Sequence, residues 1–318
     1  MALAVREAFS QALTEAGKDP RIVVLDGDLA SSTRVVLFQQ KYPERFFQMG
    51  IMEQNMMGIA AGMAAVGLIP FVSTFAAFAS CRVADQVRVS VAQPNLPVKI
   101  IGAYAGMFVG KNGKTHMAVE DIAIMRAIPH MTVLEPGDET EARLSLPAIL
   151  DHPGPVYIRV AREGTDPIFG PDYRFRLGGS YLLRDGKDVA IISTGPTTAY
   201  ALKAADLLAQ RGISAAVLHL MSIKPIDAEG VAEAASKCGA VVTLENHNIY
   251  GGVGSAVAEV LGELCPVPMA RVGIRDENGE SASNEELARK YGFSPEHCAE
   301  AAERLLERKK GQRGVRMT

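Results

Sequence analysis

Short apolar runs alternate with amphipathic stretches along the first half of the chain. The runs are rich in Val, Ile and Phe and predict strands at 22–25, 46–49, 69–73, 98–102, 132–134 and 156–160. Between them, apolar residues recur every three or four positions, which predicts helices at 2–16, 33–41, 53–66, 78–92, 119–128 and 138–150. Strands that alternate with helices are typical of βαβ units with a mainly parallel sheet.

This periodicity is lost between residues 164 and 187, where Gly, Pro, Asp and Arg dominate, and we predict a linker there. A second series follows, with strands at 189–193, 215–218, 240–244 and 269–272 and helices at 198–211, 228–237, 254–264, 284–291 and 296–309. The sequence therefore predicts an α/β fold with two βαβ domains, at 1–163 and 188–310, each with a mainly parallel sheet flanked by helices. We expect the basic tail at 311–318 to be a frayed, solvated terminus.

Bulk composition agrees with a two-domain globular enzyme. The chain has 318 residues, 48% of them hydrophobic and 22% charged, and a net charge of −3, which indicates no nucleic-acid partner. We expect no membrane span and no secretory signal, since apolar stretches are short and the N-terminus has no basic region before an apolar block. The four cysteines are widely spaced and form no CxxC pair, so we predict neither disulfides nor a zinc site, and a cytoplasmic location.

Chemically distinctive residues gather where the predicted strands end. Asp28, Glu53, Phe75, Phe78, Asn112, His116 and Arg162 each follow one strand of the first domain. Because the carboxyl ends of parallel strands share one edge of a sheet, where ligands of open α/β folds bind, the active site is predicted at this edge.

Glu53 begins a helix built otherwise of Met, Ile, Ala and Gly. A carboxylate in such apolar surroundings is suited to a charged hydrogen bond or proton exchange with a ligand nitrogen, but it could also simply offset the helix dipole. Phe75 and Phe78 could stack on a flat heterocycle or belong to the core. His116 could contact a substrate or be an exposed bystander, and Arg159 and Arg162 could bind phosphate or form surface salt bridges.

Two apparent ligand signals are discounted. The glycines of 251–255 follow a strand, but position 257, where a dinucleotide fingerprint needs its third glycine, is Val257. The pair Asp26 and Asp28 resembles a metal loop without further oxygen ligands.

Ordered segments of the chain resemble the transketolase family over nearly its whole length. In the first half these are VREAFSQAL, DGDLASST, FFQMGIMEQNMMGIAAGMAAVGLIPFVSTFAAFASCRVADQVR, GKNGKTHMAVEDIAIMRAIPHMTVLEPGDETEA and GPVYIRVAREG. In the second half they are DVAIISTGPTTAYALKAADLL, VVTLENHNIYGGVGSAVAEVL and GESASNEELARKYG. The resemblance implies a thiamine-diphosphate pyrimidine-binding domain, then a transketolase C-terminal domain, and transfer of a two-carbon ketol unit from a ketose (phosphate) to an aldose (phosphate).

By this resemblance, Glu53 matches the glutamate that hydrogen-bonds N1′ of the aminopyrimidine and so promotes loss of the proton at C2 of the thiazolium. Phe75 and Phe78 match the aromatic pocket around the pyrimidine, and Asp28 matches an acidic residue beside the cofactor. His116 matches a substrate-facing histidine that we count, with Glu53, as catalytic. The positions that match those holding a substrate phosphate are Arg6, Ser32 and Arg162.

Full-length family members carry, before this region, a domain whose GDG motif and following Asn hold Mg²⁺ and the diphosphate. The chain contains no such segment, so the resemblance implies a subunit that is inactive alone and needs a transketolase N-terminal subunit as partner. The family's active sites form between two subunits, which favours an α₂β₂ assembly with Mg²⁺ bound mainly by the partner.

Three departures from the family pattern leave the sugar open: Asn112 replaces a usual aspartate, Tyr104 a histidine, and Cys81 a tyrosine near the cofactor. We therefore assign Tyr104 and Asn112 to the substrate and Cys81 to the cofactor pocket. A 1-deoxyxylulose-5-phosphate synthase fragment, which Arg82 favours, and a 2-oxo acid dehydrogenase β subunit remain alternatives within this architecture. A non-catalytic scaffold subunit is the alternative from another class.

Overall fold

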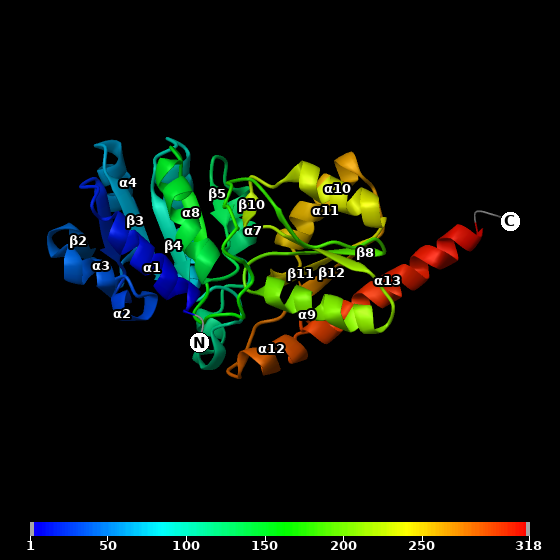
Figure 1. The fold of residues 1–318 in the computed structure, drawn as a ribbon. Helices are drawn as coiled ribbons and strands as arrows, with labels where there is room; N and C mark the ends of the chain where they lie inside the picture. Colours follow the sequence, from blue (N-terminus) through cyan, green and yellow to red (C-terminus); the bar gives the residue numbers. More distant parts are fainter. Residues whose placement is uncertain (1–2, 316–318) are drawn as a thin grey trace.

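A computed structural model describes residues 3–315 of the chain, with side chains as far as residue 310. It confirms the predicted fold class, two mainly parallel sheets flanked by helices (Figure 1). The strands are β1 (Ile22–Asp26), β2 (Phe46–Gln48), β3 (Ile69–Phe75), β4 (Lys99–Ala103), β5 (Thr132–Leu134), β6 (Val156–Val160), β7 (Tyr181–Arg184), β8 (Val189–Ser193), β9 (Ala215–His219), β10 (Ser222–Lys224), β11 (Val241–Asn248) and β12 (Met269–Ile274). The order is β10-β5-β6-β4-β3-β1-β2 in the first sheet and β12-β11-β8-β9-β7 in the second.

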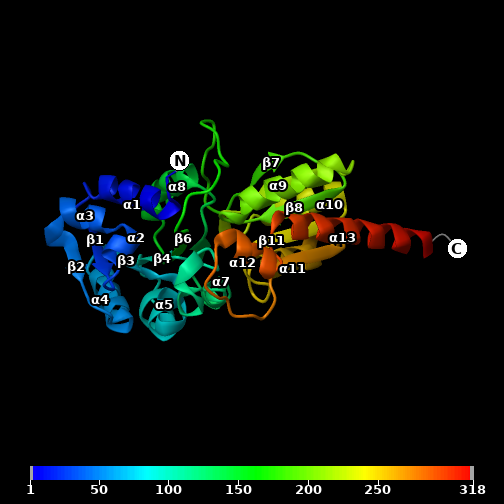
Figure 2. The ribbon, with the colours of Figure 1, turned by 90° about the horizontal axis from the view of Figure 1, so that it is seen from below.

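Helices cover both faces of each sheet. Those of the first half are α1 (Val5–Ala16), α2 (Ala30–Thr33), α3 (Val36–Lys41), α4 (Glu53–Ala65), α5 (Ala76–Ser80), α6 (Ala84–Gln86), α7 (Asp121–Ala127) and α8 (Glu139–Asp151). Those of the second half are α9 (Thr197–Gln210), α10 (Ala228–Cys238), α11 (Val253–Leu264), α12 (Asn284–Lys290) and α13 (Pro295–Val315). Figure 2 shows α1, α3 and α8 on one face of the first sheet and α4 and α5 on the other, while α9 and α13 lie opposite α10 and α11 around the second (Figure 1).

The parallel strands at the centre of the first sheet are buried along their whole length. Every residue of β1, β3, β4 and β6 is buried, as expected for strands with helices on both sides. Because these strands run parallel, their carboxyl ends lie at one edge, and α4 begins beside this edge at Glu53. The fold therefore gathers the loops that carry the predicted site residues.

Two short strands depart from the predicted domain plan. Residues 181–184, placed in the linker, form β7, which pairs antiparallel with β9 at the edge of the second sheet. Strand β10, from the second half of the chain, pairs antiparallel with β5 and extends the first sheet. Strand β7 therefore belongs to the second sheet, and β10 connects the two halves of the chain through the edge of the first sheet.

Three predicted helices differ in extent. The predicted helix at 78–92 is four short pieces: α5, a 3₁₀ turn at Cys81–Val83, α6 and a π-helical stretch at Val87–Ala92. The predicted helix at 33–41 is interrupted by Arg34, whose φ of 71° lies in the left-handed region. The first helix begins at Val5 rather than at residue 2, and residues 1 and 2 lie outside the described part.

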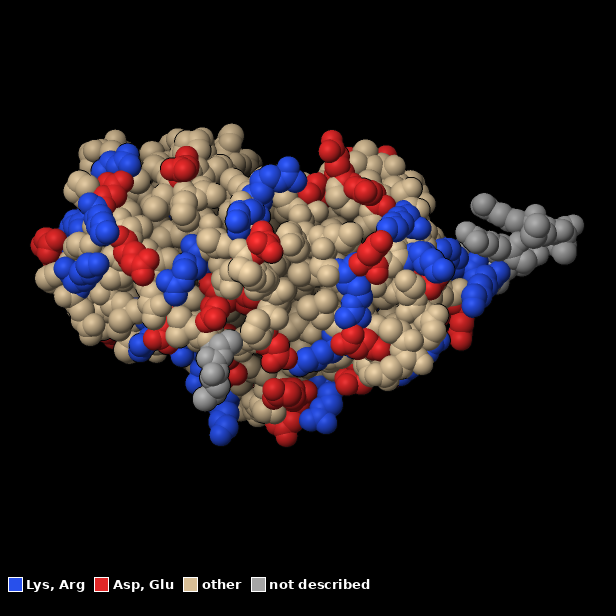
Figure 3. Space-filling model, in the orientation of Figure 1, with Lys and Arg blue, Asp and Glu red and all other residues tan. Residues whose placement is uncertain are grey.

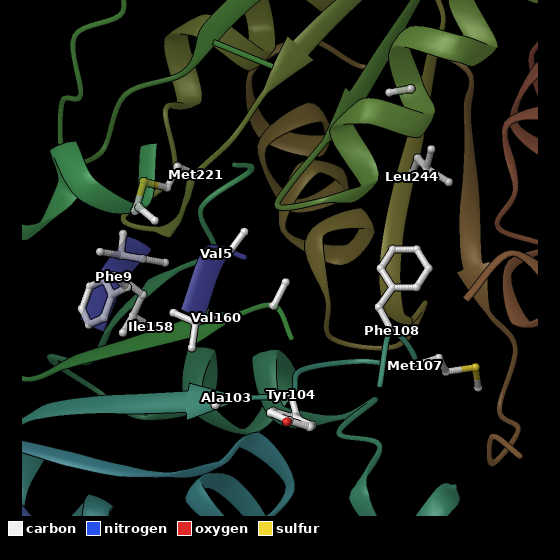
Figure 4. Packing of buried hydrophobic residues seen from close by; sticks show 14 of the residues in the cluster. Val5, Phe9, Ala103, Tyr104, Met107, Phe108, Ile158, Val160, Met221 and Leu244 are labelled. Atoms are coloured by element: carbon white, nitrogen blue, oxygen red, sulfur yellow. The ribbon is translucent and has the colours of Figure 1, made fainter. Parts of the chain in front are cut away.

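One hydrophobic cluster runs from the first sheet into the second domain. Figure 4 shows part of this cluster, with Phe9, Ile158 and Val160 from the first half of the chain and Met221 and Leu244 from the second half. The two domains therefore have a continuous core. The helix α13 continues through residue 315 into the predicted basic tail, whose last three residues lie outside the described range.

The surface carries no concentration of one charge on the face in Figure 3, where Lys and Arg intermingle with Asp and Glu. Within residues 3–315, no helix has both the length and the apolar composition needed to cross a bilayer. All four cysteines are free.

Candidate active site

Glu53 is buried at the start of α4, with a side chain 2% exposed. The Nη1 atom of Arg82 donates a hydrogen bond of 2.8 Å to Glu53 Oε1. The side chain of Arg82 is 42% exposed, so this ion pair reaches the molecular surface rather than lying sealed in the core. The same guanidinium lies 4.1 Å from the centre of the Phe78 ring, and a flat cation thus connects the carboxylate to the aromatic residues.

Four rings form a second part of the site. The Phe75 ring, at the end of β3, lies 4.2 Å from the Tyr104 ring and 6.0 Å from the Phe78 ring, stacked on both. The His116 ring packs edge-on against Phe75 and Phe78 at 5.6 and 5.7 Å between centroids. Phe75 is buried but Phe78 and His116 are partly exposed, so the cluster faces outward at the strand ends. Phe75 thus belongs to the hydrophobic core, whereas Phe78, packed against that core, keeps a partly exposed side chain on which a flat ring could stack.

Two arginines contact Tyr104, one from the beginning of the first domain and one from its end. Arg6, in the first turn of α1, donates to Tyr104 Oη at 2.5 Å and to the carbonyl oxygen of Ser32. Arg162, after β6, donates to the carbonyl oxygen of Val109 at 2.8 Å. Both guanidinium carbons lie above the Tyr104 ring, at 5.1 and 5.4 Å from its centre. The predicted substrate residues therefore meet at one place.

Asn112 belongs to the same group, because Arg162 Nη1 lies 3.4 Å from its Oδ1. Its side chain is exposed on a short 3₁₀ turn, Gly110–Asn112. Cys81 lies at the rim, where its Sγ donates to Glu120 Oε1 at 3.2 Å. Burial and the neighbouring Glu120 carboxylate raise the pKa of the Cys81 thiol to about 11, so the thiol stays protonated at neutral pH.

Asp28 is exposed in a left-handed conformation with φ of 65°, while the preceding carboxylate, Asp26, is fully buried. Asp26 Oδ2 accepts from the backbone N–H groups of Leu29 and Ala30 at 2.9 and 3.1 Å and from Gln48 Nε2 at 2.9 Å. Burial raises the pKa of Asp26 above its usual value. Its Oδ1 atom is buried and has no hydrogen-bond partner among the described residues.

Arg159 is not a phosphate ligand, and the interpretation of it as either a phosphate ligand or a surface residue is wrong. Its guanidinium is fully buried and donates to Asp121 and Glu135, with Nε–Oδ2 and Nη1–Oε1 distances of 2.8 and 2.5 Å. Its Nη2 atom also donates to the carbonyl oxygen of Asn246, in the second domain, at 3.2 Å. Arg159 therefore belongs to the junction between the domains.

The glycine-rich turn at 251–255 is occupied by the chain itself. Both carboxylate oxygens of Glu245 accept the first N–H groups of α11, from Val253 at 2.7 Å and Gly254 at 3.0 Å. A phosphate would need these same donors. This geometry agrees with the prediction that the turn is not a nucleotide site. Within residues 3–315, no group of three or more side chains could hold a metal ion.

Three residues of the site were missed or undervalued in the sequence. Arg82 carries no signal of pairing with Glu53, since 29 positions separate them. Asp26 lies in an apolar strand, where an isolated carboxylate could have suggested a buried hydrogen-bonding role. Asn246 lies in the second domain yet contacts the loop that carries Tyr104 and His116.

Comparison with known proteins gives the class of this arrangement. The transketolase pyrimidine binding domain matches residues 1–166, and the transketolase C-terminal domain matches residues 178–298. The chain belongs to the transketolase family, a family of transferases.

Individual relatives refine this picture. A 6-deoxy-6-sulfo-D-fructose transketolase subunit of Clostridium sp. strain MSTE9 is 48% identical over 96% of this chain and 95% of its own. A solved structure described as a split gene transketolase, inactive beta4 tetramer, superposes with a TM-score of 0.87 at 45% identity, covering 96% of this chain and 99% of the other. The 1-deoxy-D-xylulose-5-phosphate synthase of Thermomicrobium roseum is more distant, at 38% identity over 92% of this chain and 47% of that enzyme. The chain thus corresponds along its length to transketolase subunits.

Proposed function

We propose that the chain is the C-terminal subunit of a split, thiamine-diphosphate-dependent transketolase. The observation that carries this proposal is the buried carboxylate of Glu53, which Arg82 connects to the partly exposed ring of Phe78, itself stacked on Phe75. A carboxylate and aromatic faces are the groups that a heterocycle with a protonatable ring nitrogen requires.

The residues present fit the pyrimidine end of this cofactor. Glu53 would share a proton and a hydrogen bond with the ring nitrogen, and Phe78 would pack against the ring. Asp26 Oδ1 and Thr74 Oγ1, buried without partners among the described residues, offer further polar atoms near the ends of β1 and β3. When bound, the cofactor supplies the electron sink, while this chain supplies orientation and controls a proton at Glu53.

A separate partner chain would bring the diphosphate domain and Mg²⁺. The related split-gene structure is described as inactive in the form of a beta4 tetramer, which supports the need for a second kind of subunit. An α₂β₂ assembly with two sites is the simplest arrangement that satisfies this need.

The substrate would be a ketose with an anionic end. Arg6 and Arg162, both close to Tyr104, provide forked donors suited to a tetrahedral oxyanion. The Clostridium relative is named for a sulfonated sugar, so a sulfonate as well as a phosphate fits this proposal. His116, which packs edge-on against Phe75, would contact the sugar and act on its hydroxyl protons.

The test is Glu53→Gln in the enzyme reconstituted from this chain and its partner. We expect kcat to fall about 10²–10⁴-fold, the usual contribution of a proton-transferring group, while assembly is unchanged. Glu44→Gln is the matched control, because Glu44 is 67% exposed and lies on the turn before β2, at the other end of this strand from Glu53. Wild-type turnover in the Glu53 variant would refute the assigned role.

A second assay separates the alternatives. Ketol transfer and pyruvate decarboxylation are measured side by side with the reconstituted pair. Transfer without decarboxylation supports a transketolase, the reverse supports a synthase or a 2-oxo acid dehydrogenase, and neither activity supports a scaffold subunit.

A further inference from the structure

The loop at 104–116 has an unusual backbone. Tyr104, Gly106, Gly110 and Gly113 all have positive φ angles, between 59° and 79°. A bulky residue such as Tyr104 adopts this region only where its surroundings enforce it. The regular secondary structure of the loop consists of two short 3₁₀ turns, which make few internal hydrogen bonds. Contacts with residues outside the loop must therefore hold most of its backbone in place.

One contact from outside the loop is Asn246, a residue of β11 in the second domain that is 3% exposed. Its Oδ1 atom accepts the backbone N–H of Met107 at 2.7 Å, and its Nδ2 atom lies 3.4 Å from the carbonyl oxygen of Ala105. A carboxamide is a side chain that offers an acceptor and a donor side by side. A Cβ atom at Gly106 would overlap the Asn246 amide, so the loop backbone is pressed against this one side chain.

Asn246 is itself fixed from the first domain. Its carbonyl oxygen accepts from Arg159 Nη2 at 3.2 Å, and Arg159 is held in turn by two buried carboxylates. Phe108, next in the loop, packs between Tyr200 and Phe293 of the second domain, with 5.6 Å between ring centroids in each pair. The second domain thus supports the loop through the Asn246 carboxamide and through the aromatic packing of Phe108.

We propose that Asn246 is a positioning residue, through which the C-terminal domain holds the loop in the shape that places Tyr104 and His116 beside Phe75. This inference rests on the proposed function of those residues as substrate contacts. Glu53, on α4, is paired with Arg82, and both residues lie outside the loop, so the carboxylate that would bind the cofactor should depend on Asn246 less than the substrate contacts do.

The first measurement follows the loop itself and needs no activity. Hydrogen exchange of the full chain is compared for wild type, Asn246→Ala and the control Asn248→Ala. Asn248 lies on the same strand, but its side chain makes a local contact, accepting the N–H of Tyr250 at 3.2 Å. We expect the peptide containing Met107 to lose protection in the Asn246 variant and to keep it in the control.

The second measurement uses the enzyme reconstituted with its partner. Asn246→Ala should raise KM for the sugar substrates about tenfold, because two buried backbone groups lose their partner and the competent loop conformation becomes less populated. The apparent KM for thiamine diphosphate should stay at the wild-type value. General destabilisation would instead lower the active fraction and leave KM unchanged for both ligands.

Gly106→Ala reaches the same contact from the loop side and should reproduce this KM pattern if the Asn246 variant does not fold. Unchanged protection of Met107 in Asn246→Ala, or an equal rise in KM for sugar and cofactor, would overturn the proposal. If the wild-type pair transfers no ketol unit, the proposed function fails, and the exchange result still decides whether Asn246 holds the loop.

Discussion

The buried ion cluster at the domain junction allows a quantitative prediction. In Arg159→Leu, Asp121 and Glu135 stay buried without the guanidinium that now binds both, although the Tyr157 hydroxyl still donates to Asp121 at 2.6 Å. Removing one partner of a buried charge pair costs about 3–5 kcal/mol. With roughly 2–4 °C per kcal/mol for large domains, the melting temperature should fall by roughly 6–20 °C.

The pH dependence of this loss identifies its cause. Burial already raises the pKa of Glu135, and without Arg159 only the weaker attraction of His219 opposes that effect. A carboxyl with a raised pKa in the folded state stabilises the fold at low pH and loses this contribution as pH rises. The difference between variant and wild type should therefore be larger at pH 8 than at pH 5.

The assay is thermal unfolding at both pH values, with each transition read separately because the chain has two domains. Arg304→Leu is the control, since Arg304 is 66% exposed and pairs with Glu300 at 3.4 Å on the surface, where such pairs contribute little. Adding Glu135→Gln to Arg159→Leu should restore part of the loss. A melting temperature close to that of the control, or a deficit that grows toward pH 5, would refute the reasoning.

Two further predictions concern a buried lysine and the cofactor. Lys99 is fully buried and donates to the carbonyl oxygens of His152 and Gly154 at 2.7 and 2.8 Å, and burial lowers its pKa to about 7. The unfolded chain keeps the Lys99 proton up to about pH 10.5, so the urea midpoint of wild type should rise between pH 7 and pH 10. In Lys99→Met this rise should be absent. Parallel plots of urea midpoint against pH for the two proteins would contradict the prediction. By calorimetry, the chain alone should bind thiamine diphosphate with Mg²⁺ weakly or not at all. Its described part contains no metal-binding cluster, and Glu53 is paired with Arg82. Tight binding without a partner would show this prediction to be wrong.

The sequence predicted the site in outline because each of its signals is local. An apolar run bounded by polar residues predicts a buried strand, and parallel strands bring Glu53, Phe75 and His116 to the same edge whatever the details of packing. The burial of Glu53 likewise follows from the apolar helix that it begins. These inferences need only periodicity and the direction of the chain.

Tertiary structure alone decided which partners meet across long distances in sequence. In the sequence, Arg159 near the end of its strand cannot be told from an exposed arginine. Its burial is possible only because Asp121 and Glu135 lie close enough to pair with it. Strand β7 lies in a stretch without apolar period because it is an edge strand, partly exposed, whose pairing with β9 supplies its order. Periodicity shows which face of a helix or strand is apolar, but it does not show which element packs against that face. The contacts of Arg82 with Glu53 and of Asn246 with the loop depend on this packing, so the sequence did not predict them.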